Sequence, residues 1–384
     1  NKLSNNYSVG VIPKLPQRLM NGFAFALKDS IYYGGGYTTN WNDAYTNSAD
    51  TNFCIRYITS STGFISSGNG KIYKTTNSGM NWMLTKLNTN MPLRSEDFAG
   101  TQTGWTVSDS ARSKIFKTTN AGLNWSSGNL IGNIKAKSVD FVSTDTGWVA
   151  GEEGKIFKSV TGGASWDSVT RKSFDNLYSI SFVNKKFGWA CGENGRIVKT
   201  TNGGVTWDTV KFSNNALYSI HFKDSLKGYI AGANGTIGKS TDGGATWSGV
   251  KTEAYGNLRS VDIRNSDTVV VCGDRGNILY SNNGDKWERI YGVSPNNLLS
   301  ICLIPGTNKT SVCGSNGYTS YANNGCFRYS ISNNTFALAV NNTGAGWITK
   351  QNIPKPIAEV YSSAAALNDS SGYVFGGMTT GDST

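Results

Sequence analysis

Charged residues and histidine are scarce in this chain of 384 residues. Asp, Glu, Lys and Arg together make up 16% of it, and His221 is its one histidine. Its six cysteines stand singly, with no Cys-x-x-Cys pair. Because a zinc site needs clustered thiolates and imidazoles, we predict neither a metal nor another cofactor. No run of eighteen apolar residues occurs, so the sequence predicts no membrane-spanning helix.

The residues that are abundant are typical of turn-rich β proteins. Gly occurs 46 times, and Asn, Ser and Thr dominate the polar residues. The formal net charge is +11 at pH 7. The sequence opens on Asn1, without an initiator methionine or an apolar signal core. This favours the mature form of an exported protein, located in the periplasm, at the outer membrane or outside the cell.

One octet, TTNGGVTW at residues 200–207, recurs along most of the chain. Its copies end at aromatic residues that lie 43, 41, 41, 40, 40 and 40 residues apart. These residues are Trp82, Trp125, Trp166, Trp207, Trp247, Trp287 and Phe327. A fixed period near forty residues indicates a stacked or radial repeat fold.

Each octet predicts a tight hairpin turn. Its third residue, such as Asn202 or Asp242, can accept hydrogen bonds from backbone N–H groups of the turn, and the glycine at the fifth position of most copies tolerates a positive φ. The closing tryptophan begins the next strand and anchors the hairpin. These residues resemble the Asp-box, or BNR, repeat, whose pattern is S/T-x-D-x-G-x-x-W. The resemblance implies a β-propeller but no single function, because the box is a structural turn in unrelated proteins.

Four short strands can be assigned in each unit from alternation and turn residues. The units begin near Phe53, Arg94, Lys137, Tyr178, Leu217, Arg259 and Leu299. Four antiparallel strands form one propeller blade, and because no blade can bury both of its faces alone, the blades must close into a ring. We therefore predict an all-β fold with seven Asp-box-type blades over residues 53–330.

The two ends of the chain have a different pattern. Residues 1–52 and 331–384 carry Pro-containing turns, followed by paired strands with Gly-Gly ends, and they resemble kelch repeats. A blade shared between the termini would remove exposed strand edges, so we expect residues 331–384 to close the ring with a strand at residues 7–12. Residues 38–50 are then a long loop or a degenerate blade. This favours one domain over residues 1–384 with eight blades, and seven blades are the alternative.

The cysteines are predicted to be structural. Cys191, Cys272 and Cys313 stand before a glycine, where sister repeats have alanine, and this is typical of small core residues. Cys302 and Cys313 fall on adjacent strands of one repeat and could pair, and the sequence leaves that bridge open.

The Asp-box resemblance implies that the first strand of each unit lines a central tunnel, with the boxes on the face opposite the ligand. One equivalent position then surrounds the tunnel mouth with Arg94, Lys137, Tyr178, Tyr218 and Arg259. A second position, at the start of the third strands, holds Lys71, Lys114, Lys155 and Arg196. We predict that both sets bind a partner with anionic groups. The alternative is that they only keep the protein soluble. A further lysine column, ahead of the boxes, is predicted to be a solvated rim: Lys74, Lys117, Lys158, Lys199 and Lys239.

Deeper in the tunnel, the predicted lining is a polar ring of Arg56, Asp97, Asp140, Ser181, His221, Asp262 and Cys302. Such a ring could be an acid–base set, but it is also typical of a hydrated channel lining. The Arg-Ile-Pro motif that most sialidases carry does not occur. We assign no catalytic residue and predict that the protein is not an enzyme.

The repeat at residues 188–207 is also similar to single-chain propellers of the photosystem II stability and assembly factor type, and the likeness spans residues 53–327. Such proteins are not enzymes and hold partner proteins through a basic face. We expect an exported, protein-binding propeller that acts as an accessory subunit of a bacterial envelope or secretion assembly at the outer membrane. Its partner is predicted to be a protein and not nucleic acid. The alternative is a carbohydrate-active propeller, either a glycan hydrolase or lyase or a lectin-like binder.

Overall fold

The structure, a computed structural model, divides into two compact units. One spans residues 41–327, and the other combines residues 1–40 with residues 328–384. The first is described from residue 41 to residue 322, apart from residues 47, 127, 170–174, 253, 265–267 and 291–293. The second is described only as the strand segments named next.

The unit made from both ends of the chain contains a four-stranded sheet in the order β1 (Phe23–Leu27), β2 (Ser30–Gly34), β33 (Thr335–Asn341) and β34 (Gly344–Thr349). It also contains the pair β3 (Tyr37–Thr38) with β32 (Ser330–Ile331) and the hairpin β35 (Ser363–Asn368) with β36 (Ser371–Phe375). The predicted strand at residues 7–12 lies outside the described residues. The resemblance of these segments to kelch repeats stays a prediction.

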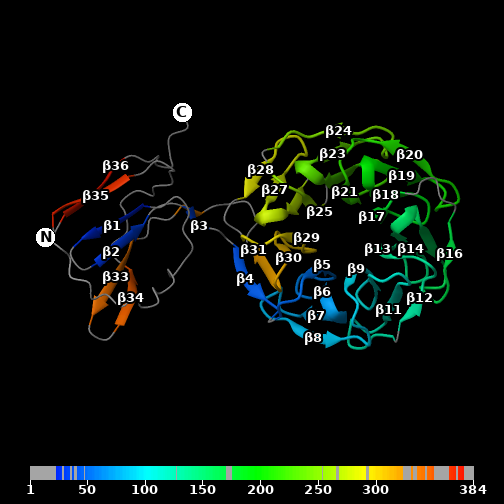
Figure 1. Cartoon of the computed structure of the whole chain (residues 1–384), viewed down its shortest axis with the longest axis horizontal. Coiled ribbons are helices and arrows are strands. Elements are labelled where there is room, and N and C mark those ends of the chain that lie inside the picture. The colour runs from blue at the N-terminus through cyan, green and yellow to red at the C-terminus, as the bar shows by residue number, and fades with distance from the viewer. Residues whose placement is uncertain are drawn as a thin grey trace. The chain divides into compact units, whose positions relative to one another are not determined.

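The unit that spans residues 41–327 is a β-propeller of seven antiparallel four-stranded blades around a central tunnel (Figure 1). The first four blades are β5 (Asn52–Tyr57), β6 (Gly63–Ser67), β7 (Lys71–Thr75) and β8 (Met83–Lys86); β9 (Leu93–Ala99), β10 (Thr103–Ser108), β11 (Lys114–Thr118) and β12 (Asn129–Leu130); β13 (Ala136–Phe141), β14 (Gly147–Gly151), β15 (Ile156–Ser159) and β16 (Asp167–Ser168); and β17 (Leu177–Phe182), β18 (Gly188–Gly192), β19 (Arg196–Thr200) and β20 (Asp208–Lys211). The last three are β21 (Leu217–Phe222), β22 (Gly228–Gly232), β23 (Ile237–Ser240) and β24 (Ser248–Gly249); β25 (Leu258–Ile263), β26 (Val269–Gly273), β27 (Ile278–Ser281) and β28 (Glu288–Ile290); and β29 (Leu298–Leu303), β30 (Thr310–Gly314), β31 (Tyr318–Ala322) and β4 (Trp41–Tyr45).

Strand β4 corrects the prediction of eight blades closed by a blade that the termini share. It pairs antiparallel with β31, from Trp41 opposite Ala322 to Tyr45 opposite Tyr318, and so supplies the outer strand of the seventh blade. The ring therefore closes with seven blades. The degenerate octet that ends at Phe327 is not followed by a fourth strand of its own in this blade, and the segment before the first repeat takes that place. Closure by a strand distant in sequence leaves the seventh blade complete.

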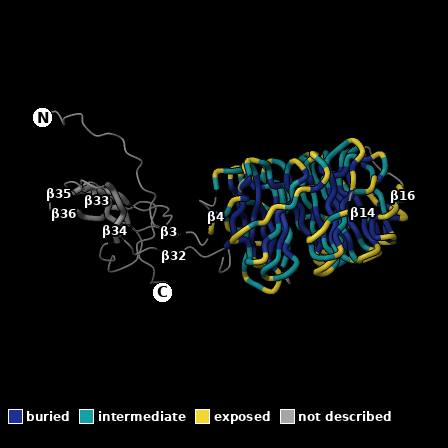
Figure 2. Tube along the Cα trace, turned by 90° about the horizontal axis from the view of Figure 1, so that it is seen from below, coloured by how far each residue is buried: buried dark blue, intermediate teal, exposed yellow. Residues whose placement is uncertain are grey.

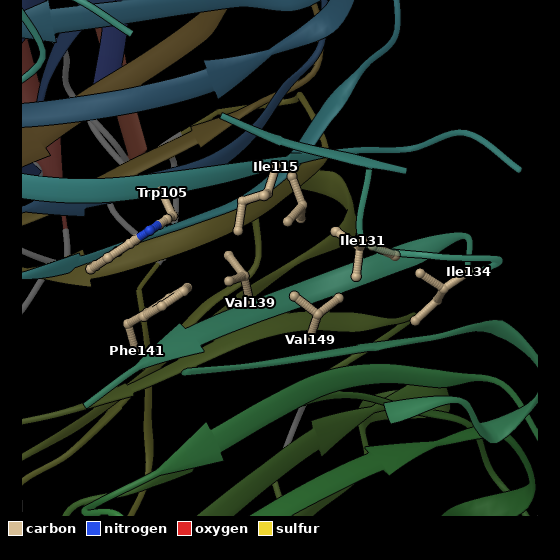
Figure 3. Packing of buried hydrophobic residues seen from close by; sticks show 9 residues of the cluster. Trp105, Ile115, Ile131, Ile134, Val139, Phe141 and Val149 are labelled. Carbon is tan, nitrogen blue, oxygen red and sulfur yellow. The ribbon is translucent and has the colours of Figure 1, made fainter. Parts of the chain in front are cut away.

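Apolar side chains between neighbouring blades form the core. The second strands carry it: every residue of β14, β18, β22 and β26 is buried, because each strand has a sheet neighbour on both sides and another blade on each face. Trp105 of the second blade stacks on Phe141 of the third at 3.6 Å between ring centroids (Figure 3). Buried residues fill the interior of the blades, and exposed ones gather at their turns (Figure 2).

The octets form the turns that the sequence predicts. In the copy that ends at Trp207, the Asn202 side-chain oxygen accepts the Thr206 N–H at 2.9 Å, and Gly204 has a φ of 91°. The sequence interpretation missed the first residue of the octet. The Thr200 hydroxyl oxygen accepts the Gly204 N–H at 2.9 Å, and the same bond recurs in the five other tryptophan-ended copies.

The lysine column ahead of the boxes is not the solvated rim that we predicted. All five lysines are half-buried. Lys74 donates to the Ala121 carbonyl oxygen at 2.7 Å, and Lys158 donates to the Gly203 carbonyl oxygen at 3.0 Å, in each case within the box of the next blade. Lys239 pairs with Asp285 in the same way at 2.7 Å. These three ammonium groups therefore connect the turns of adjacent blades.

The cysteines of the described region are free thiols. Cys191, Cys272 and Cys313 are fully buried in second strands, as the sequence predicts for small core residues. Cys302 and Cys313 do not form a bridge. In the register of β29 and β30 they lie opposite different residues, Ser311 and Ser300 respectively.

Candidate functional site

The tunnel mouth is a cavity of about 340 Å³ to which each of the seven blades contributes one residue. That residue is the second of the first strand in every blade, and around the ring the set is Phe53, Arg94, Lys137, Tyr178, Tyr218, Arg259 and Leu299. The structure thus brings together all five residues that were predicted for the mouth. The sequence interpretation missed Phe53 and Leu299, although the repeat alignment places them at the same position.

The cations of the mouth are paired with acids from the turns that follow the second strands. Arg94 binds Asp109 at 2.7 Å, and Arg259 binds Asp274 at 2.9 Å. Lys137 lies between Asp109, at 3.3 Å, and Glu152, at 3.2 Å. The three predicted cations of the mouth are therefore largely neutralised, and the mouth presents compact ion pairs.

Aromatic rings fix the same cations from another side. The Arg94 guanidinium lies 4.2 Å from the Phe53 ring centroid, and the Arg259 guanidinium lies 4.7 Å from that of Tyr218. The Tyr178 and Tyr218 rings are 5.7 Å apart, and the Tyr178 hydroxyl donates to Glu193 at 2.8 Å. Burial, together with this acceptor and its charge, raises the Tyr178 pKa. The mouth is thus an ordered surface before any partner binds.

The second predicted set does not line the mouth cavity. Lys71, Lys155 and Arg196 follow the turns between second and third strands, and each pairs there with an acidic side chain: Asp50, Glu153 and Asp175. Lys114 is exposed at the start of β11. These four residues lie on four different blades outside the mouth cavity, and their part in partner binding stays a prediction.

Below the mouth, serines join the first strands of adjacent blades. Each serine hydroxyl oxygen accepts a backbone N–H of the next blade at 3.1–3.3 Å, and the serines are Ser95, Ser138, Ser179, Ser219, Ser260 and Ser300. The bond from the Ile55 N–H to Ser300 spans the junction between the last and first blades. Cys54 takes the serine position in the first blade. The sequence interpretation missed this ring, whose signal is a serine two residues before the polar tunnel residue.

The predicted polar ring lines a second cavity of about 320 Å³, and all seven of its residues contribute to it. Its members also join blades. Asp97 accepts the Phe141 N–H at 2.7 Å, Asp262 accepts the Leu303 N–H at 2.7 Å, and Asp140 accepts the Phe182 N–H. The three aspartates of the polar ring therefore connect adjacent blades.

The remaining carboxylate oxygens of the ring form pairs across the tunnel wall. Arg56 binds Asp97, and His221 Nδ1 lies 2.9 Å from Asp262. Burial raises the pKa of Asp262, but hydrogen bonding to His221 and the charge of that residue lower it overall. For Asp140 the opposite holds. Burial and the charge of Asp97 raise its pKa well above the ordinary value, and Arg56 offsets this only in part.

Glu96 is an acid that the sequence interpretation did not single out. It lines the tunnel cavity, only 3% of it is exposed, and neither of its carboxylate oxygens has a hydrogen-bond partner. The other six blades have isoleucine or valine at this position of the first strand, for example Ile55 and Val139. Burial raises the pKa of Glu96 well above its ordinary value of 4.5, against the effect of the Arg56 charge. The repeat alignment carries this signal, because an acid replaces an otherwise aliphatic residue.

Replacing Glu96 with glutamine is expected to change how stability depends on pH. Because the folded-state pKa is raised, protonated Glu96 stabilises the fold below pH 4.5, and this contribution is lost as the pH rises through the raised value. The free energy of unfolding of Glu96→Gln should therefore exceed that of the unchanged protein by about 1–3 kcal/mol at pH 8, and the gap should shrink towards pH 4. Urea denaturation at several pH values measures it. Glu288→Gln, on the exposed start of β28, is the control, and equal pH profiles for both variants would contradict the assignment.

Comparison with known proteins places the fold. A family model described as photosynthesis system II assembly factor YCF48 matches residues 123–216 and 212–298, which is less than half of the chain. The chain is similar to YCF48. One solved structure, titled "YCF48 bound to D1 peptide", has a TM-score of 0.62 at 17% identity and covers 74% of this chain and 97% of its own. Another, YCF48 from Cyanidioschyzon merolae, has a TM-score of 0.63 at 16% identity, with coverages of 74% and 98%. At such identities the likeness shows the propeller fold alone.

No curated protein matches the sequence. Among the residues that the structure describes, no three His, Cys, Asp or Glu side chains are grouped so that they could hold a metal ion. Within the same residues, no helix has the length and hydropathy needed to span a membrane.

Proposed function

We propose that this chain is a non-enzymatic propeller that binds a protein partner at its tunnel mouth. The observation that carries the proposal is the mouth cavity, where one side chain from each of the seven blades meets on a rigid scaffold. Two pairs of apolar or aromatic residues from adjacent blades, Leu299 with Phe53 and Tyr178 with Tyr218, are separated around the ring by the cations. Rigid aromatic anchors beside arginine are the residues that dominate binding energy in protein interfaces.

The ion pairs of the mouth favour a peptide-like ligand over a simple anion. Arg94 and Arg259 already hold carboxylates, so a free anion would have to displace a tethered one. A partner segment that combines an apolar side chain with a carboxylate can cover the rings and share the remaining N–H donors of the guanidinium groups. The solved YCF48 that is bound to the D1 peptide supports such a ligand class for this fold.

The tunnel carboxylates argue against the carbohydrate-active alternative. One carboxylate oxygen of each tunnel aspartate accepts a backbone N–H of the next blade; these residues are Asp97, Asp140 and Asp262. A paired-carboxylate glycosidase needs two acids free to contact the sugar and water.

We further propose the setting expected from the sequence, an exported accessory subunit of a bacterial envelope or secretion assembly.

The test is a comparison of two double variants on opposite faces. The unchanged protein is first used to isolate a stoichiometric partner from envelope extract. The affinity for that partner is then measured for the unchanged protein and for Tyr178→Ala/Tyr218→Ala. The mouth variant should bind at least about tenfold more weakly, which corresponds to ~1.4 kcal/mol. Met80→Ser/Leu123→Ser changes two exposed residues of the box turns and should bind normally. Equal affinity of all three proteins would show that the mouth is not the site, and saturable glycan binding without any protein partner would overturn the function.

A further inference from the structure

At the end of the tunnel opposite the mouth, one position of the repeat changes from apolar to cationic in two adjacent blades. The position lies two residues after the polar ring, at or just after the end of each first strand. The fifth and sixth blades have Lys223 and Arg264 there. The other five blades have an apolar residue that packs against the core between blades, namely Ile58, Ala99, Val142, Val183 and Ile304. The packing of the repeat therefore does not require the two cations.

Beside these cations lies a cavity of about 830 Å³, here called the exit cavity. The fifth, sixth and seventh blades form its wall, which includes the apolar residues Ile263, Leu303 and Pro305 as well as Lys223 and Arg264. No aspartate or glutamate is among its described lining residues. Its volume lies in the range of about 300–1,000 Å³ that is typical of sites for small ligands.

Arg264 is held in place by neutral groups. Its guanidinium donates to the Asn308 side-chain oxygen at 3.3 Å and to the Lys309 carbonyl oxygen at 2.9 Å, both in the seventh blade. These bonds use two of the five N–H groups of a guanidinium, and among the described residues Arg264 is in no ion pair. The mouth residues Arg94 and Arg259, in contrast, each bind a carboxylate. Arg264 is therefore ordered but keeps its charge and several N–H groups for a ligand.

Two further donor groups line the exit cavity. Lys223 is exposed, and in the described part of the chain its ammonium group pairs with no acid. The next residue, Asp224, accepts two backbone N–H groups at 2.8 Å within its own turn. The Asn308 amide, whose oxygen accepts from the guanidinium, still has its NH₂ group. His221 also lines the cavity, and its Nδ1 is bound to Asp262 at 2.9 Å. The exit cavity thus offers a ligand two positive charges and an amide donor beside an apolar wall.

We propose that the exit cavity binds the carboxylate of an organic ligand whose apolar part covers Ile263, Leu303 and Pro305. A guanidinium matches a carboxylate in geometry, and the two carboxylate oxygens can accept from both cations. Inorganic phosphate would match the charge but has no apolar part for this wall. The site goes beyond the proposed function, because it shares no lining residue with the mouth. Its ligand can be a free acid or the carboxyl group of a peptide.

Isothermal titration calorimetry on the full chain tests the proposal with four probes: hexanoate, hexanamide, acetate and inorganic phosphate. We expect hexanoate to bind at millimolar concentrations. Hexanamide lacks the charge and acetate lacks the alkyl chain, so each should bind at least about tenfold more weakly. Acetate or phosphate that binds as tightly as hexanoate would contradict a site for a carboxylate on an apolar body.

Substitutions locate the site. Lys223→Gln and Arg264→Gln should each weaken hexanoate binding at least about tenfold. Lys186→Gln is the matched control, because it removes the same charge from an exposed lysine in the corresponding loop of the fourth blade, outside the cavity. Arg264→Gln alters bonds to the seventh blade, so thermal unfolding checks that this variant is folded, and Lys223→Gln decides the question if it is not. Unchanged affinity in Lys223→Gln, or equal weakening in Lys186→Gln, contradicts the proposal.

The double variant Tyr178→Ala/Tyr218→Ala separates the exit cavity from the mouth. It should bind hexanoate as the unchanged protein does, because neither tyrosine lines the exit cavity. Hexanoate binding that is lost in this variant and kept in Lys223→Gln would place the acid at the mouth and overturn the proposal. Partner binding at the mouth is measured separately, so failure here leaves the proposed function untouched.

A short peptide that ends in leucine, compared with the same peptide amidated at its C-terminus, separates the two sources of the carboxylate. Binding of both hexanoate and the free-acid peptide, each weakened by Lys223→Gln, indicates a general site for organic carboxylates. Binding of the free-acid peptide alone, weakened in the same way, assigns the exit cavity to the carboxyl group of a peptide. If neither binds at millimolar concentrations, the proposal is wrong.

Discussion

Replacing Trp207 with alanine is expected to lower the free energy of unfolding by about 3–5 kcal/mol. This tryptophan is 3% exposed and is the one box tryptophan that is fully buried. Its ring meets the edge of Phe182 at 5.9 Å between centroids, and Phe182 stacks on Trp148 at 3.6 Å. Truncation would leave a cavity beneath that stack, between the third and fourth blades, where rigid strands cannot collapse to fill it.

Chemical denaturation of the full chain measures this loss. Val205→Ala is a matched control in the same turn, because Val205 is 71% exposed and its truncation should change stability by less than about 0.5 kcal/mol. A Trp207→Ala variant that loses no more than Val205→Ala would show that the turn itself anchors the hairpin without the ring.

The period near forty residues was enough to predict the blades, because the residues of each repeat specify their own turn and strands. Asn202 and Gly204 specify a turn from local geometry, and the alternation in β21 and β22 specifies two strands without reference to the rest of the chain. Aligned repeats also located the tunnel and mouth residues, since equivalent positions of a closed ring lie at equal depth.

Closure could not be predicted in the same way. Strand β4 has the sequence WNDAY, which shares no motif with the boxes, and its pairing with β31 joins residues about 275 positions apart. Because the Gly-Gly strand ends near both termini resemble kelch repeats, we predicted that the terminal segments share the closing blade, and this prediction was wrong. A single strand of five residues has too little periodic signal to be distinguished from a loop.

The sequence interpretation assigned charges to positions around the mouth and did not assign the acids of the turns to particular cations. Arg94 and Asp109 are 15 residues apart, and so are Arg259 and Asp274, a spacing that reaches from a first strand to the turn after the second. Comparing acids and bases at this recurring spacing would have predicted the ion pairs. Comparing the residues at equivalent positions of the repeats would also have revealed Glu96, which is an acid at a position where the other blades have an aliphatic residue.

Replacing Asp97 with alanine is expected to destabilise the propeller by about 2–4 kcal/mol, more than any other substitution in the polar ring. The change leaves the Phe141 N–H without its acceptor and removes the partner of Arg56. Loss of one member of a fully buried ion pair costs about 3–5 kcal/mol, and the expected loss is smaller here because 40% of the Arg56 side chain is exposed. Denaturation by urea measures it.

Asp97→Asn separates the two causes. Its amide oxygen can still accept the Phe141 N–H, so this variant should lose only about 1–2 kcal/mol, the part that comes from the charge. The pKa of Asp140 should also fall, because the charge of Asp97 is one of the causes that raise it, and carboxyl titration followed by NMR detects the shift. Equal losses for Asp97→Ala and Asp97→Asn would mean that the bond between blades contributes nothing and that the Arg56 charge alone keeps an acid at this position.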